Sequence, residues 1–176
     1  MASMKNNKLS QITAGCVFFI FLAMGCVPKQ TVITEENLEI KDLNEFINIL
    51  EGYRNGVLAN RNGEKLRTQI MTFSYLEGNR AYFCTTNDKP LYAQLVKFPF
   101  VSYCIYPENW EPVLSLNGKA VFVSDKTIRE RALDANYYAK RNFKTTDNPL
   151  LEVFYIDVDI IETYGSDGTN IYAAKR

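Results

Sequence analysis

The stretch RAYFCTTNDK at residues 80–89 is the part of the sequence that most constrains the fold. Its aromatic and β-branched residues predict a strand over 81–85. Pro90 comes next, and apolar residues recur at helical spacing from Leu91 to Phe98, which predicts a short helix directly after the stretch. Backbone N–H groups without partners and the helix dipole favour anions at such a helix start. The stretch therefore predicts a strand that turns into a helix at a place suited to phosphate.

Turns and short strands surround this stretch on both sides. The dipeptide Asn62-Gly63 lies between two β-prone runs, which is a strong hairpin signal. Gly118 inside a further strand indicates a bulge or a close approach of two backbones, and Ser124-Asp125 is expected to cap a helix. In chain order we expect a helix over 42–50, strands over 57–59, 66–75 and 81–85, a helix over 90–98, strands over 100–106 and 113–123, helical segments from Thr127 and over 137–142, and a last strand over 150–158.

The order of these elements indicates the fold class. Antiparallel hairpins dominate, few βαβ units are expected, and neither a GxGxxG nor a Walker pattern occurs, which argues against a doubly wound nucleotide-binding sheet. We therefore expect a mainly β protein with flanking helices, built as an antiparallel barrel. A chain of 176 residues is long enough for one such domain and little else.

Charge and histidine content narrow the range of functions. Lys plus Arg and Asp plus Glu number 20 each, and no basic stripe follows an expected element, so no nucleic-acid partner is expected. The chain contains no histidine, which removes the most common general base near neutral pH and the usual haem and zinc ligand. Any chemistry must therefore come from carboxylates, Lys, Tyr, Cys or a bound cofactor.

The N-terminal residues have the composition of an export signal. Lys5 and Lys8 precede an apolar run over 14–23, which is shorter than the about 20 residues that span a bilayer. Cys26 follows Leu22-Ala23-Met24-Gly25 and resembles the lipidated cysteine of a bacterial lipobox, although the leucine lies one place earlier than usual. We expect a lipoprotein-type signal peptide over 1–25, a tether over 26–40, the domain over 41–165 and a C-terminal tail over 166–176.

These segments predict a place in the bacterial cell envelope, with the lipid on Cys26 as the only contact with a membrane. In the alternative interpretation, residues 14–24 form a buried or interfacial helix of the domain. The protein would then be cytoplasmic.

The order of motifs along residues 43–164 resembles the pyridoxamine 5'-phosphate oxidase-like FMN-binding split barrels, in particular their short bacterial members. The resemblance is carried by GVLA at 56–59, NGEKLR at 62–67, RAYFCTTNDK at 80–89, QL at 94–95 with FP at 98–99, and LNGKAVF at 116–122. It implies a split β-barrel, a homodimer, and FMN as the cofactor in two clefts at the subunit interface.

Within this resemblance, Arg67 and Lys89 would bind the FMN phosphate with help from Thr85 and Thr86. The chemistry agrees, because a phosphate dianion favours an arginine fork, a lysine charge, hydroxyl donors and free N–H groups. Taken one at a time, each residue has a structural alternative. Arg67 could be a solvated strand residue, Lys89 a surface residue at a helix start, and the two threonines simply good strand formers.

The resemblance also implies where the flavin ring would lie. The backbone from Arg67 through Gln69 to Ile70 would run along the edge of the isoalloxazine ring. Trp110 would cover a ring or an interface.

The sequence departs from the family where histidine is expected. A true pyridoxamine-phosphate oxidase carries an Arg and a His in its C-terminal segment, whereas this chain ends in IYAAKR at 171–176. Oxidation of pyridoxamine phosphate is therefore not expected, and the haem-handling and nitroimidazole-reducing branches are disfavoured for the same reason.

Three functions remain in competition. The first is an FMN-dependent oxidoreductase that acts on a small organic substrate. The second is a non-catalytic module that binds a flavin or another phosphate ligand, and the third is a dimeric envelope protein without a cofactor. Cys84 and Cys104 are expected to be small buried hydrophobic residues, with a disulfide between them as the alternative.

Overall fold

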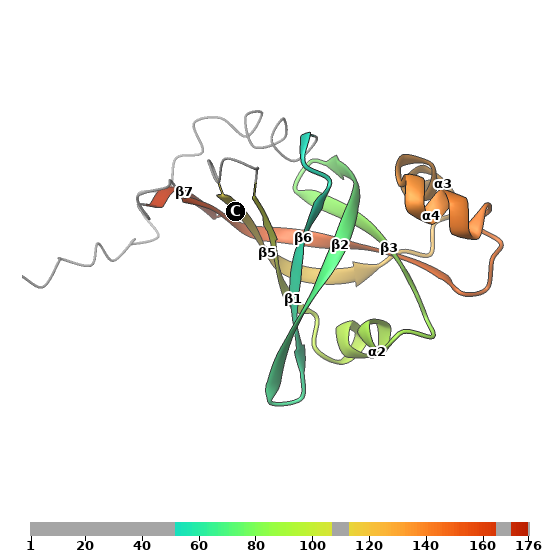
Figure 1. Ribbon diagram of the computed structural model, residues 1–176, viewed down its shortest axis with the longest axis horizontal. Helices are drawn as coiled ribbons and strands as arrows, with labels where there is room; N and C mark the ends of the chain where they lie inside the picture. The colour runs from blue at the N-terminus through green and yellow to red at the C-terminus, as the bar shows by residue number, and fades with distance from the viewer. Residues whose placement is uncertain (1–51, 107–112, 165–169, 176) are drawn as a thin grey trace, which may run out of the picture. The chain divides into compact units, whose positions relative to one another are not determined.

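Six strands close into an antiparallel barrel in the computed structural model (Figure 1), which describes residues 52–106, 113–164 and 170–175. The strands follow the order β3-β2-β1-β4-β5-β6, and β6 pairs back with β3 to close the barrel. Their bounds are β1 Asn55–Asn62, β2 Lys65–Glu77, β3 Arg80–Thr86, β4 Phe100–Ile105, β5 Val113–Phe122 and β6 Leu151–Tyr164. The fold class expected from the sequence is confirmed.

Three helices are inserted between the strands. They are α2 Pro90–Lys97, α3 Lys126–Ala135 and α4 Tyr137–Phe143. Asp125 caps α3 by accepting a hydrogen bond from the Ile128 N–H at 2.9 Å, as the sequence predicts. Asn136 ends α3 and caps α4 by accepting from the Ala139 N–H at 3.0 Å, so the two segments are separate helices.

The C-terminal part of the sheet is longer than the sequence predicts. The last expected strand, 150–158, continues to Tyr164 in β6, and residues assigned to the tail form β7, Asn170–Lys175. The first half of β6 pairs with β3 and the second half with β7. The sheet therefore runs past the barrel, beyond the expected end of the domain at residue 165.

The barrel interior is filled by one cluster of large apolar side chains. Alternate strand residues point inward, as expected for strands that are buried on one face. The fully buried members include Leu58, Phe73, Phe83, Tyr103 and Phe154, all at 0% exposure. A second cluster around Tyr82, Val123, Ala132 and Val153 lies beneath α3.

Gly118 lies at a register shift between β5 and β6, which confirms the predicted irregularity. A Cβ atom at this position would lie 2.1 Å from the Asp157 carbonyl oxygen. Glycine is therefore required here because two backbones approach each other more closely than a side chain allows.

Cys84 and Cys104 are free thiols, so the disulfide alternative does not form. The Cys84 Sγ lies 3.8 Å from the Ser74 Oγ, and burial raises the pKa of this thiol to about 11. Cys84 therefore stays protonated at neutral pH, as expected of a buried structural cysteine.

Several sequence expectations fall outside the described residues. These are the signal peptide with Cys26, the tether, the helix over 42–50, and Trp110. Among the helices that the structure describes, none is long and apolar enough to span a membrane.

Candidate functional site

The turn between β3 and α2 contains three of the predicted phosphate ligands. Thr85 and Thr86 end β3 and are 4% and 5% exposed, and both pair with the first residues of β6. The Lys89 N–H donates to the Thr86 carbonyl oxygen at 3.3 Å, which closes a tight turn before the helix. Thr85, Thr86 and Lys89 are therefore held together within one short segment.

The hydroxyl of Thr86 is buried and has no hydrogen-bond partner among the described residues. A buried polar atom left in this state costs about 1–3 kcal/mol. Such an exception to the pairing of buried polar groups calls for an explanation, and a ligand that supplies the missing partner is one.

The start of α2 has one backbone donor without a partner among the described residues, the Leu91 N–H. Lys89 occupies the N-cap position with an extended backbone and no side-chain cap, and Pro90 is the first helical residue. The first turn carries no acidic residue. Pro90 has no N–H and the Tyr92 N–H donates to the Lys89 carbonyl oxygen at 3.1 Å, so the Leu91 N–H and the positive end of the helix dipole are the features that favour an anion here.

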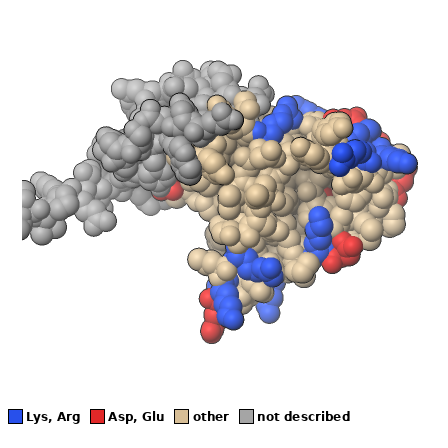
Figure 2. Space-filling model, viewed as in Figure 1, with Lys and Arg blue, Asp and Glu red and all other residues tan. Residues whose placement is uncertain are grey.

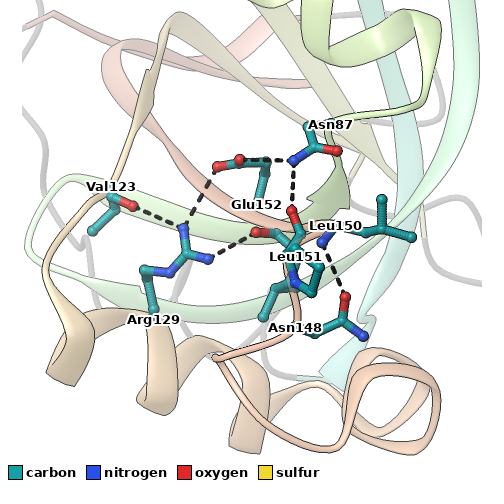
Figure 3. Close-up of polar contacts among 8 residues, drawn as sticks. Asn87, Val123, Arg129, Asn148, Leu150, Leu151 and Glu152 are labelled. Atoms are coloured by element: carbon teal, nitrogen blue, oxygen red, sulfur yellow. Dashed lines mark hydrogen bonds and ion pairs between the residues drawn. The ribbon is translucent and has the colours of Figure 1, made fainter.

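A polar network around Asn87 and Glu152 holds the turn between β3 and α2 in place (Figure 3). The Asn87 amide donates to the Pro149 carbonyl oxygen at 2.7 Å and to the Glu152 Oε1 at 3.4 Å. Arg129 of α3 lies 3.5 Å from the other carboxylate oxygen of Glu152 and donates to the Leu151 carbonyl oxygen at 2.7 Å. Because Arg129 and Glu152 are largely buried, this network holds the turn in one position before any ligand binds.

Arg67 and Gln69 lie on the face of the β1–β2 hairpin that is directed toward α2. Arg67 pairs across the hairpin with Asn60, so their side chains share one face. Asn60 is 2% exposed and donates to the Gln94 Oε1 of α2 at 2.8 Å, and its own oxygen accepts from Gln69 at 3.5 Å. The structure therefore links the hairpin to α2 through Asn60 and Gln94, two residues that the sequence argument did not assign to the site.

One edge of β2 is open where the flavin ring is expected. Residues 65–72 of β2 pair with β1, but pairing with β3 begins only at Phe73. The opposite edge of 65–70 therefore has no strand partner among the described residues. Ile70 contributes backbone to this edge, while its side chain points to the outer face of the sheet and is 79% exposed. An open edge offers alternating donors and acceptors to a planar heterocycle.

Basic residues outnumber acidic ones around the hairpin tip and α2. Figure 2 shows basic side chains at the lower end of the molecule, where Figure 1 draws the β1–β2 turn and α2. The basic residues of these segments are Arg61, Lys65, Arg67, Lys89 and Lys97, against Glu64 and Asp88. A hollow of about 370 Å³ separates the turn at Asn62 and Gly63 from α2. The charge of these segments therefore suits an anionic ligand, although Lys97 is the only one of these basic residues among the described lining of the hollow.

Solved structures identify the fold. A Clostridium acetobutylicum protein related to general stress protein 26, of the pyridoxinephosphate oxidase family, superposes with a TM-score of 0.64 at 14% identity, covering 74% of this chain and 92% of that one. General stress protein 26 from Bacillus anthracis gives 0.62 at 22% identity over 73% and 96%. A Listeria innocua protein provisionally assigned as a pyridoxamine 5'-phosphate oxidase gives 0.60 at 25% identity over 68% and 94%. This chain therefore has the pyridoxamine 5'-phosphate oxidase-like split-barrel fold, as its sequence motifs predict.

One structural neighbour is described by the ligand that it binds. A haem-binding protein from Mycobacterium smegmatis also superposes, with a TM-score of 0.60 at 20% identity, and this chain spans 55% of its length. No protein-family model and no curated protein matches the chain. The chemistry of the site itself therefore decides which ligand suits this chain.

Proposed function

We propose that this domain binds FMN and acts as an FMN-dependent oxidoreductase on a small organic substrate. The observation that carries the proposal is the buried, unpaired Thr86 hydroxyl beside the uncapped start of α2. A phosphate group would accept from this hydroxyl and from the Leu91 N–H together.

The residues around this turn fit the two halves of FMN. Thr85, Thr86 and Lys89 would hold the phosphate with the Leu91 N–H, and Arg67 would approach from the hairpin face that is directed toward α2. The open edge of β2 over 67–70 would hydrogen-bond the ring. When bound, FMN would supply the redox chemistry, which suits a chain without histidine.

Haem fits this chain less well than a flavin. The sequence contains no histidine, the residue that most often ligates haem iron, whereas the open strand edge and the anion-binding turn suit a phosphorylated planar ligand. The non-catalytic alternative also predicts FMN binding. Reduction of the bound flavin by a nicotinamide donor would separate it from the oxidoreductase.

The outer face of the barrel supports a homodimer as part of the proposal. Leu66, Ile70 and Phe100 are 81%, 79% and 66% exposed and belong to neighbouring strands of the β2-β1-β4 sheet. Ala59 of β1 pairs with Ser102 of β4 on this face, and Arg61 of β1 pairs with Leu66. Large exposed apolar patches of this kind mark interaction surfaces. We expect twice the chain mass in light scattering, and a monomer at micromolar concentration would contradict this part of the proposal.

Replacing Thr86 by valine tests the proposal through two effects of opposite sign. The variant Thr86→Val removes the unpaired hydroxyl but keeps the shape of the side chain, so the ligand-free protein should gain up to about 1 kcal/mol in its free energy of unfolding. The affinity for FMN should fall about tenfold because one phosphate donor is lost. Chemical denaturation and FMN titration of the full chain measure the two quantities.

The variant Thr86→Ser is the matched control for this experiment. It keeps the hydroxyl and should bind FMN within about threefold of the unchanged protein, because the donor to the phosphate is retained. If Thr86→Val stabilised the protein without weakening FMN binding, the hydroxyl would be only a packing defect and the phosphate assignment would be wrong.

A further inference from the structure

A second hollow, distinct from the phosphate turn, opens at the outer face of the barrel. It has a volume of about 420 Å³ and lies where β1, β2, the end of β4 and α4 meet. Its walls include Asn55 and Gly56 of β1, Ile70 and Thr72 of β2, Tyr106 after β4, and Tyr138 of α4. Its volume is in the range of small-molecule pockets.

None of the described residues that line this hollow is charged. Tyr138 is half exposed, and Arg141 lies against its ring at 6.0 Å without lining the hollow. A phosphate, sulfonate or carboxylate group would therefore meet no paired cation on these walls, which is unfavourable wherever the group is shielded from water. This composition selects against anions, in contrast to the turn at the start of α2.

The polar groups that remain favour a neutral ligand with an acceptor atom. The Thr72 hydroxyl donates to the Asn55 side-chain oxygen at 2.8 Å, which fixes the orientation of the Asn55 amide. The Asn55 NH₂ group makes no hydrogen bond to another described side chain or backbone group and is left as a donor. Two tyrosine rings provide flat walls on which a planar ring can pack.

We propose that this hollow binds uncharged planar ring compounds that carry a carbonyl oxygen, of which quinones are the simplest example. The carbonyl oxygen accepts from the Asn55 amide, and the ring packs against Tyr138. Ile70 lines the hollow, ends the open edge of β2 and belongs to the face proposed for the homodimer, so a ligand in the hollow lies beside that edge and next to the proposed subunit contact.

Binding of menadione, a neutral naphthoquinone, to the full chain without flavin tests this inference. Equilibrium dialysis should give a dissociation constant on the order of 10–100 μM, as expected for a small ligand with one polar contact. The variants Tyr138→Ala and Asn55→Ala should each weaken binding about fivefold to tenfold. Because the two variants are measured separately, a folding defect in one of them would not explain weaker binding in both.

Tyr137 provides the matched control. It neighbours Tyr138 on α4 and is more exposed, at 69% against 51%, but it does not line the hollow. The variant Tyr137→Ala should bind menadione as the unchanged protein does, and 1,4-naphthoquinone-2-sulfonate should bind at least about tenfold more weakly than menadione because of its charge. Absence of menadione binding, equal losses in Tyr137→Ala and Tyr138→Ala, or equal affinity for the sulfonate would each overturn the inference.

The same protein titrated with FMN separates this inference from the proposed function. If the protein bound menadione but not FMN, the proposed ligand of the hollow would stand and the proposed FMN site would be wrong. If the protein bound FMN but not menadione, the FMN site would stand and the proposed ligand of the hollow would be wrong. The same holds if a second copy of the chain covers the hollow.

Discussion

Arg67→Ala and Lys89→Ala should each weaken FMN binding by about tenfold to a hundredfold. Hydrogen bonds between charged groups contribute about 1.5–3 kcal/mol, which corresponds to this range of affinity. Both side chains are exposed, and neither makes a contact that holds the described fold together, so thermal stability without ligand should not change. Titration at fixed ionic strength measures the effect, because salt screens exposed charges.

Riboflavin and a distant lysine provide the controls for this prediction. Riboflavin lacks the phosphate, so its affinity should be insensitive to both substitutions if Arg67 and Lys89 bind that group. Lys140→Ala removes the same charge on α4, where the lysine pairs with Asp134, and should leave FMN affinity unchanged. Equal losses for FMN and riboflavin, or an equal loss in Lys140→Ala, would show that the two residues do not contact the phosphate.

Gly118→Ala should destabilise the domain by about 3 kcal/mol or more. The new Cβ would lie 2.1 Å from the Asp157 carbonyl oxygen and 3.1 Å from the Val158 Cα, and both are backbone atoms of the paired strand β6. Neither can move without separating β5 from β6, so the strain falls on the sheet that closes the barrel. We expect the midpoint of thermal unfolding to fall by about 10 °C, measured by circular dichroism.

Gly52→Ala is the control for this substitution. A Cβ at Gly52 meets no atom within 4 Å, so the midpoint should stay within about 2 °C of the unchanged protein. If Gly118→Ala had as little effect as Gly52→Ala, the close approach of the two strands at the bulge would be wrong.

Local signals in the sequence predicted much of the barrel. The Asn62-Gly63 turn and the strand-to-helix stretch at 80–89 each depend on residues near one another in the chain, and both are present. The irregularity at Gly118 involves the distant Asp157, but a glycine inside a strand indicated it. The strand β7 was missed. It exists because the second half of β6 extends past β3 and leaves an edge to pair, which only the register of the whole sheet reveals.

Only part of the candidate site could be predicted, because some of its contacts join segments that are distant in the chain. Thr85, Thr86 and Lys89 share one turn, so the sequence could group them. The contact of Asn60 with Gln94 and the unpaired state of the Thr86 hydroxyl depend on packing between distant segments, which spacing alone does not reveal. The sequence signal for the contact of Asn60 with Gln94 was an asparagine within a strand, close to the hairpin turn.

The most direct test of the account is the affinity of the purified full chain for FMN, measured by quenching of flavin fluorescence with riboflavin titrated in parallel. We predict a dissociation constant for FMN in the micromolar range or below, and one for riboflavin at least about tenfold higher, because riboflavin lacks the phosphate that would satisfy Thr86 and the start of α2. A folded protein that binds neither flavin, or binds both equally, would contradict the account.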